Sequence, residues 1–188
     1  MPPRPAMKDC NLFFFDCETG GLNPTDSDMV EVACIVTDPT GQSVLNEFCA
    51  KVIPKKPVGP KAAAINGYTT EKWAAEAVNL DVAMVTMLGM ARDAVFVAHN
   101  TPFDWGFFDM AMAQRGQRWP GDYHKIDTVA LATPLLKAGH IPNLKLVTLT
   151  AHFNIEHEAH RALGDAQACR SVYLRLMEMY APAFATVH

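Results

Sequence analysis

The hydrophobic and polar pattern of the first third of the chain predicts three consecutive β-strands. Residues 11–17 (NLFFFDC) are mostly apolar, and residues 29–38 and 43–53 alternate between apolar and polar positions. Both alternating segments are rich in β-branched residues, which is typical of strands. The sequence DPTG separates them and places Pro39 and Gly41 where a turn favours them. We therefore expect a three-stranded antiparallel meander.

Beyond the meander the pattern changes from the period of a strand to that of a helix. A loop rich in Pro and Lys runs to Pro60, and after a favourable N-cap at Asn79 apolar residues recur at helical spacing. Residues 94–99 (AVFVAH) predict a short buried strand, after which Asn100 or Thr101 caps the next helix. The remaining expected elements are the end of that helix near Gln114, a strand within 124–128 (HKIDT), and helices near 128–138, 144–153 and 162–179.

This order of elements predicts the fold class. Three strands followed by alternating helices and strands imply a mixed sheet covered by helices, an α/β fold. A length of 188 residues suits one domain with a sizeable core, and no linker-like segment divides the chain. We expect residues 1–8 to form a loose N-terminal tail and residues 9–182 to form the domain.

Two acids follow the first predicted strand in an unusual arrangement. Asp16 and Glu18 are two residues apart, so in a strand they project to the same side. Two like charges held close together repel and raise each other's pKa, and a bound cation would relieve that repulsion. This stretch alone leaves open the alternative that the strand end simply reaches solvent and carries acids by chance.

Two further stretches carry chemically interesting residues. Asp104 follows the short buried strand in the first turn of a helix, at the kind of junction where α/β sheets form sites. An acid there also suits the positive end of the helix dipole. His160 and Asp165 are five residues apart, a poor fit to one helix face. We therefore expect Asp165 in the first turns of the last helix and His160 in a loop before it, where the side chain can swing.

Charge and cysteine content narrow the class of protein. The formal net charge of −4 is not the basic excess of a protein that grips long duplex DNA. It does not exclude a nucleic-acid enzyme, because divalent cations on a cluster of acids would bring the charge to about zero. The five scattered cysteines, without a C-x-x-C pair, indicate reduced thiols and a cytoplasmic protein. No apolar stretch is long enough for a signal peptide or a membrane span.

Taken together, three segments resemble a known family. FFFDCETGGLNP, HNTPFD and HRALGDA resemble, in order and spacing, the three motifs of the DEDDh exonucleases, the DnaQ-like branch of the ribonuclease H-like superfamily. The linking segments EVACIVTD, AAAINGYT, IDTVALA and NLKLVTLTAHFNI also resemble the family, so the likeness covers nearly the whole chain. It implies a ribonuclease H-like mixed sheet of five strands.

The resemblance also implies an activity. This family hydrolyses phosphodiester bonds from a 3′ end, releases nucleoside 5′-monophosphates and uses two divalent cations, Mg²⁺ or Mn²⁺. Carboxylate oxygens suit such hard cations. By resemblance, His160 is the general base, a role that fits a side chain titrating near neutral pH. The metal ligands implied by the resemblance are Asp16, which bridges both ions, Glu18, Asp104 and Asp165.

Other positions are implied to bind the terminal nucleotide. Thr19 and the turn that begins at Gly20 can offer backbone N–H groups near the 3′ end, and Asn100 can bond a phosphate or sugar. Ile65 and Phe103 resemble apolar contacts that stack against the last bases, although ordinary core packing would equally explain them. The chain has Thr-Gly-Gly after Glu18 where many relatives have Thr-Thr-Gly, which affects the shape of the nucleotide pocket.

Several alternatives stay open at this point. The expected substrate is single-stranded DNA, but the family also includes ribonucleases that trim RNA, and no residue here visibly selects for or against the 2′-OH. A catalytically silent binding module is a different class of function, and the intact acids argue against it. Proofreading with a polymerase bound in trans and free-standing repair or degradation are both compatible with the sequence, which does not indicate an oligomeric state. A zinc site would have to use His152, His157 and His160 with Glu156 or Glu158 nearby, without a familiar zinc spacing.

Overall fold

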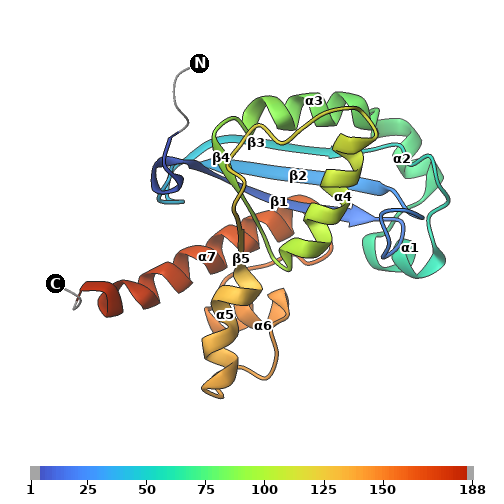
Figure 1. Cartoon of the computed structure of the whole chain (residues 1–188). Helices are drawn as coiled ribbons and strands as arrows, with labels where there is room; N and C mark the ends of the chain where they lie inside the picture. Colours follow the sequence, from blue (N-terminus) through green and yellow to red (C-terminus); the bar gives the residue numbers. More distant parts are fainter. Residues whose placement is uncertain (1–4, 186–188) are drawn as a thin grey trace.

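A five-stranded mixed sheet forms the centre of the molecule (Figure 1). The computed structural model describes residues 5–185, so residues 1–4 of the expected tail lie outside the described part, and Met7–Asp9 form a short 3-10 helix. The first three strands form the predicted antiparallel meander, and the last two run parallel to the first. The strands are β1 (Asn11–Thr19), β2 (Met29–Thr37), β3 (Val44–Lys51), β4 (Ala94–Ala98) and β5 (Lys125–Asp127), in the sheet order β3-β2-β1-β4-β5.

The helices cover both faces of this sheet, as the α/β prediction requires (Figure 1). The helix predicted to follow Asn79 is confirmed, and the Asn79 side chain accepts a hydrogen bond from the Asp81 N–H at 2.8 Å. Two short helices before it were not predicted. The helices are α1 (Pro60–Asn66), α2 (Thr70–Glu76), α3 (Leu80–Met90), α4 (Thr101–Ala113), α5 (Thr128–Lys137), α6 (Leu146–His152) and α7 (Ala162–Ala185).

Alternation along β1 divides the core into two layers. Phe13 and Phe15 face the layer that contains α3 and α4, where they pack with Phe108 of α4. Phe14 faces the opposite layer and packs edge-on against Tyr173 of α7, with ring centroids 5.5 Å apart. Because side chains alternate along a strand, the acids that follow Phe14 at two-residue steps also face α7. Burial of this aromatic row thus fixes the direction in which the acids point.

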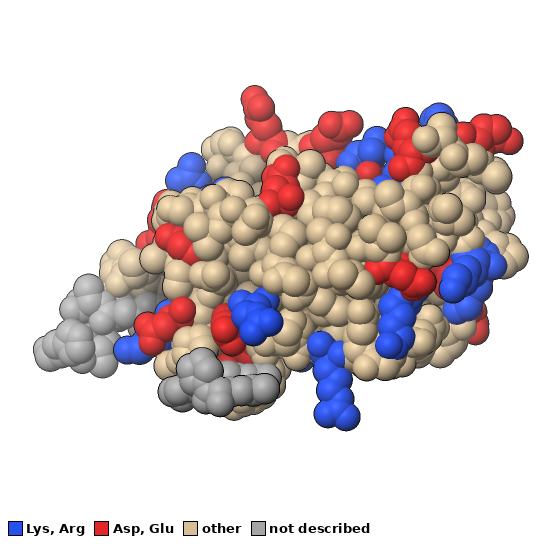
Figure 2. Space-filling model, turned by 90° about the horizontal axis from the view of Figure 1, so that it is seen from above, with Lys and Arg blue, Asp and Glu red and all other residues tan. Residues whose placement is uncertain are grey.

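The outer surface on the α3 side carries no concentrated positive charge. Seen from above in Figure 2, positive and negative side chains are interspersed around a largely uncharged middle. On α3, Val82 and Val85 are 58% and 63% exposed, so this helix is apolar on its outer side as well as its inner side. Within residues 5–185 the structure contains no helix that is both long and apolar enough to cross a membrane.

Candidate active site

The first two acids lie at the end of β1, on the side of the sheet that faces α7. Asp16 and Glu18 are both half-buried there. Burial raises the pKa of Glu18 to about 7, and the negative charges of Asp165 and Glu31 act in the same direction. Burial also raises the pKa of Asp16 well above its usual range, and the charge of Asp104 raises it further. Asp16 and Glu18 therefore lie on the same side of β1, as their two-residue spacing predicted.

Asp104 reaches the same end of the sheet from α4. It stands in the first turn of that helix and is only 3% exposed. Its Oδ1 accepts hydrogen bonds from the Cys17 N–H at 3.1 Å and from the Cys17 Sγ at 3.5 Å, which join α4 to β1 between the two acids of the strand. Burial raises the pKa of Asp104 to about 7, and the bonds from Cys17 oppose that shift. The carboxylate is thus held by the strand as well as by the helix dipole.

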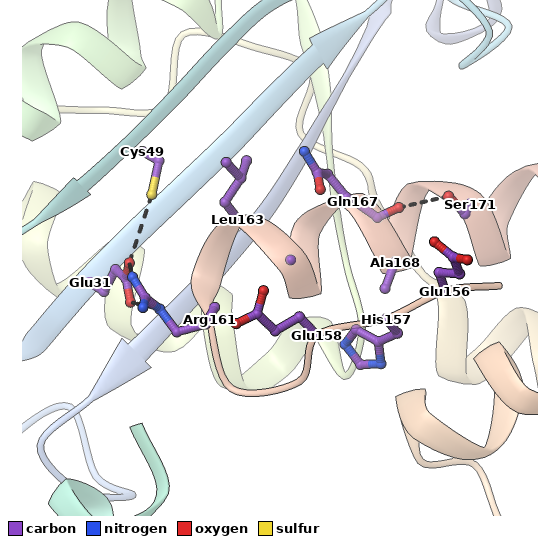
Figure 3. A pocket seen from close by; sticks show the side chains of 11 residues that line it. Glu31, Cys49, Glu156, His157, Glu158, Arg161, Leu163, Gln167, Ala168 and Ser171 are labelled. Carbon is purple, nitrogen blue, oxygen red and sulfur yellow. Dashed lines mark hydrogen bonds and ion pairs between the residues drawn. The ribbon is translucent and has the colours of Figure 1, made fainter. Parts of the chain in front are cut away.

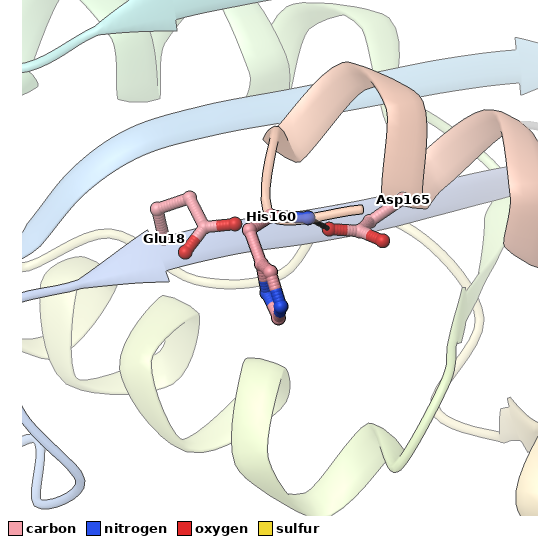
Figure 4. A group of neighbouring side chains, drawn as sticks. All are labelled: Glu18, His160 and Asp165. Atoms are coloured by element: carbon pink, nitrogen blue, oxygen red, sulfur yellow. Dashed lines mark hydrogen bonds between the residues drawn. The ribbon is translucent and has the colours of Figure 1, made fainter. Parts of the chain in front are cut away.

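The last acid and the histidine come from α7 and the loop before it. Asp165 lies in the first turn of α7, and its Oδ2 accepts the His160 N–H at 2.9 Å. His160 is exposed and has a φ of 67°, a left-handed conformation. Figure 4 shows the carboxylates of Glu18 and Asp165 on either side of the His160 backbone, with the imidazole ring extending away from the chain. Potential ligand atoms of the three residues lie within 4.8 Å of one another.

The donors at this end of the sheet fit a hard divalent cation. They are carboxylate oxygens, which Mg²⁺ and Mn²⁺ prefer over nitrogen or sulfur. Burial and mutual repulsion raise the pKa of Asp16, Glu18 and Asp104, so a cation would remove an unfavourable interaction that the chain itself creates. Among residues 5–185, the group of side chains close enough to hold a metal ion is Glu18, His160 and Asp165; it includes neither His152 nor His157, whose Nε2 lies 2.5 Å from the Asp165 Oδ1.

The residues expected to contact a nucleotide are distributed around this group. Ile65 is 58% exposed on α1, so core packing does not explain it, and it shares a groove of about 280 Å³ with His160. Asn100 is exposed and lines a second cavity of about 700 Å³ with His160 and Asp165. Phe103 is half-buried and packs against Phe107, with ring centroids 5.2 Å apart. Ile65 and Asn100 thus face open space beside His160, and Phe103 is partly core.

The turn after β1 differs from expectation in one respect. The Gly20 N–H donates a hydrogen bond to the Asp28 carbonyl at 2.8 Å, so it is not available to a ligand as the sequence reading assumed. The Gly20 carbonyl in turn accepts the Gly59 N–H at 2.8 Å. Thr19 is buried, and its hydroxyl donates to the Gly21 carbonyl at 2.7 Å. These bonds make the turn a rigid connection to the segment before α1.

The structure adds residues that the sequence reading did not assign to the site. His157 is nearly buried and bonds Asp165, and the Asn66 side chain donates to the Thr19 carbonyl at 3.1 Å, which ties α1 to the end of β1. Glu31 and Arg161 form an ion pair beside Glu18. One feature of the sequence could have indicated a role for Glu31: it is the single charged residue in the otherwise apolar or neutral strand MVEVACIVT.

Comparison with known proteins identifies the family. A family model named RNase_T and described as "Exonuclease" matches residues 13–173. The chain therefore belongs to this exonuclease family of hydrolases, and the resemblance to the DnaQ-like branch is confirmed. The sheet order and the helices around it confirm the ribonuclease H-like fold.

Individual relatives show how far the likeness extends. A PolC-type DNA polymerase III of Thermotoga maritima is 30% identical over 172 residues, which cover 91% of this chain and 12% of the polymerase. The structure of E. coli exonuclease I with a dT13 oligonucleotide superposes with a TM-score of 0.81 at 19% identity, over 94% of this chain and 43% of that chain. Exonuclease X in complex with 5′-overhanging duplex DNA gives a TM-score of 0.69 at 24% identity, over 90% and 93% of the two chains. The chain spans 12% to 27% of the length of the first curated relatives it matches.

Proposed function

We propose that this chain is a metal-dependent 3′–5′ exonuclease that removes nucleotides one at a time from single-stranded DNA as 5′-monophosphates. The observation that carries the proposal is the meeting of Glu18 from β1 and Asp165 from α7 beside the exposed His160, with ligand atoms within 4.8 Å of one another. Asp104 of α4 is bonded to Cys17, between the two acids of β1. Membership of the exonuclease family and the fold shared with exonuclease I support it.

Each residue has a task in this proposal. Asp16, Glu18, Asp104 and Asp165 would hold two divalent cations, Mg²⁺ or Mn²⁺, with Asp16 shared between them. When bound, such ions stabilise the charge that develops on phosphate oxygens and acidify a bound water. A ring nitrogen of His160 accepts a proton from the attacking water, and exposure of the ring lets it return that proton to solvent.

The open space beside the acids would receive the end of the strand. Ile65 contacts the terminal base with an exposed apolar side chain, and Asn100 bonds a phosphate or sugar from the opposite side of His160. Phe103 supports the base from its half-buried position, and Thr19 with Gly20 shapes the floor of the pocket through backbone contacts. Apolar stacking of this kind tolerates any base, which suits the trimming of strands of any sequence.

A direct test uses two 5′-labelled single strands of one sequence, one of DNA and one of RNA. Each is incubated with the protein in Mg²⁺, in Mn²⁺ and in chelator. The variant Asp104→Asn removes a proposed ligand, and Asp109→Asn removes an exposed acid from the same helix as a matched control. A metal-dependent ladder that shortens from the 3′ end, present in the control and absent in Asp104→Asn, is the expected result.

The other outcomes assign the protein differently. A ladder on RNA alone would replace the DNA proposal with RNA trimming, and no ladder in any metal would favour a binding module. The PolC-type relative motivates one further arm, in which a DNA polymerase is added to a primer with a mismatched 3′ end. Faster mismatch removal with the polymerase present would indicate proofreading in trans, whereas an unchanged rate would indicate a free-standing enzyme.

A further inference from the structure

Glu31 is a buried charge near the start of β2, opposite the end of β1 that carries Glu18. Its side chain is 3% exposed on β2, where it points to the α7 side together with Ala33 and Ile35. Burying a carboxylate is expensive unless it is paired and hydrogen-bonded. The partner is Arg161, whose Nη2 lies 2.9 Å from the Glu31 Oε1 and whose Nε lies 3.2 Å from the Oε2. Such a two-pronged contact fixes the orientation of both groups as well as their distance.

This ion pair connects the two halves of the proposed site. In the register of the sheet, Glu31 lies directly opposite Glu18 on the neighbouring strand. Arg161 is the residue that follows His160. Figure 3 shows the Arg161 side chain reaching from the loop before α7 to Glu31 on β2. The contact therefore ties the backbone beside the histidine to the strand beside a proposed metal ligand.

Besides this ion pair, the loop is held by two contacts with Asp165, one from the His157 Nε2 and one from the His160 N–H. A cavity of about 520 Å³ lies between the loop, α7 and the sheet, and both Glu31 and Arg161 line it, so packing against the sheet does not hold the Arg161 side of the loop. His160 itself is exposed and has a φ of 67°, which is unfavourable for a residue other than glycine and persists only where neighbours impose it. The bond from its N–H to Asp165 constrains one side, and the Arg161 ion pair constrains the other.

We propose that Glu31 and Arg161 are positioning residues for His160, whose ion pair holds the loop where the imidazole ring can reach the reacting water. The inference rests on the proposed function, because it requires His160 to be the general base. Neither residue touches the substrate in this role. Their contribution is to keep His160 in place between Glu18 and Asp165.

The test is a double-mutant cycle on the 5′-labelled DNA strand. Arg161→Ala and Arg161→Lys are measured in the natural sequence and in a His160→Ala background, and Arg175→Ala, which removes an exposed ion pair with Glu178 from α7, is the control. We expect Arg161→Ala to lower kcat by about 10- to 100-fold with KM within about twofold, the range for a residue that orients a reacting group. Lysine keeps the positive charge but cannot donate two parallel hydrogen bonds as the planar guanidinium group does, so Arg161→Lys should retain only part of the rate. In the His160→Ala background the loss should vanish.

Three results would overturn the inference. The first is a loss of rate from Arg161→Ala that multiplies with the loss from His160→Ala. The others are a rise in KM at constant kcat, and no change in rate when Arg161 is removed. If His160→Ala alone leaves the rate unchanged, the proposed function has failed instead. Arg161→Ala leaves the Glu31 charge buried without its partner, which lowers stability. The double variant Glu31→Gln/Arg161→Ala also removes that charge, so it shows whether the loss of kcat comes from lower stability or from a misplaced His160. Its thermal midpoint should recover while its kcat stays low, and recovery of both would show that the pair acts only on folding.

Discussion

The two halves of the proposed site differ in how the chain holds them. Asp16 and Glu18 stand on β1, the central strand of the sheet, and Asp104 is fixed to that strand through Cys17. His160 stands on a loop beside a cavity and is exposed. The comparison suggests a division of labour: the proposed metal ligands of β1 and α4 are fixed by the sheet, and the exposed group proposed to move a proton is held on a loop by an ion pair and hydrogen bonds.

The largest loss of rate is expected from changes to the acids that the sheet fixes. Asp16→Asn removes the acid proposed to be shared between two cations, so the rate should fall by about 10³-fold or more. The rise in thermal midpoint that Mg²⁺ or Mn²⁺ produces should shrink as well, because the same carboxylate binds the ions. Turnover of the labelled strand and thermal unfolding with and without metal measure the two quantities. A variant that loses turnover yet keeps the full metal-dependent shift would contradict the shared-ligand role.

A change to His160 on the loop should lower the rate without weakening metal binding. His160→Ala is expected to lower the rate by about 10²- to 10⁴-fold, the usual range for a general base, because the ring accepts the proton of the attacking water. The metal-dependent rise in thermal midpoint should be kept, since carboxylates hold the ions. His152→Ala, on exposed α6 surface, serves as the control. If His160→Ala loses the metal response to the same degree as Asp16→Asn, the proposed division between the two halves is wrong.

A third expectation concerns the stability of the metal-free protein. The pKa of Glu18 and of Asp104 is about 7 in the folded chain, raised from 4.5 and 3.8 by burial. The folded state therefore binds protons more tightly than the unfolded state, and stability present at low pH is lost as the pH rises through about 7. Thermal midpoints in chelator should fall between pH 5 and pH 8, and added Mg²⁺ should raise the midpoint more at pH 8 than at pH 5. Equal metal effects at both pH values would show that these acids do not carry the binding.

The smallest effect on the reaction is expected from Ile65, which belongs neither to the acids nor to the loop of His160. Ile65→Ala should raise KM by about fivefold with little change in kcat, since it removes roughly 1 kcal/mol of apolar contact with a base. The thermal midpoint should stay constant, because the side chain is 58% exposed. Val82→Ala, which removes an equally exposed side chain from α3, is the matched control. A drop in stability instead of a rise in KM would return Ile65 to the role of a packing residue.

The sequence predicted what depends on short-range pattern. The two-residue step from Asp16 to Glu18 placed both acids on one side of a strand, and the five-residue step from His160 to Asp165 placed one in a loop and the other on a helix. The meander, the α/β class and the family resemblance were confirmed. The meander and the α/β class follow from periods of two and 3.6 residues, which single segments display, whereas the family resemblance depends on the three motifs.

What the sequence did not predict depends on long-range geometry or on very short elements. α1 and α2 have seven residues each, too few for a helical period to be recognised. The contact between Glu31 and Arg161 joins positions 130 residues apart, and it exists only because the sheet register places Glu31 beside Glu18. The Gly20 N–H was expected to be free because its partner, the Asp28 carbonyl, comes from the far side of a turn.

The dependence of the site on α7 has a consequence for biosynthesis. Asp165 and the support of β1 and β2 both come from the last helix, which contacts these two strands. While a ribosome is still making the chain, a product that ends before α7 already contains Asp16, Glu18, Asp104 and His160 but lacks the fourth acid. The proposed metal site is therefore complete only once the first turn of α7 has been synthesised.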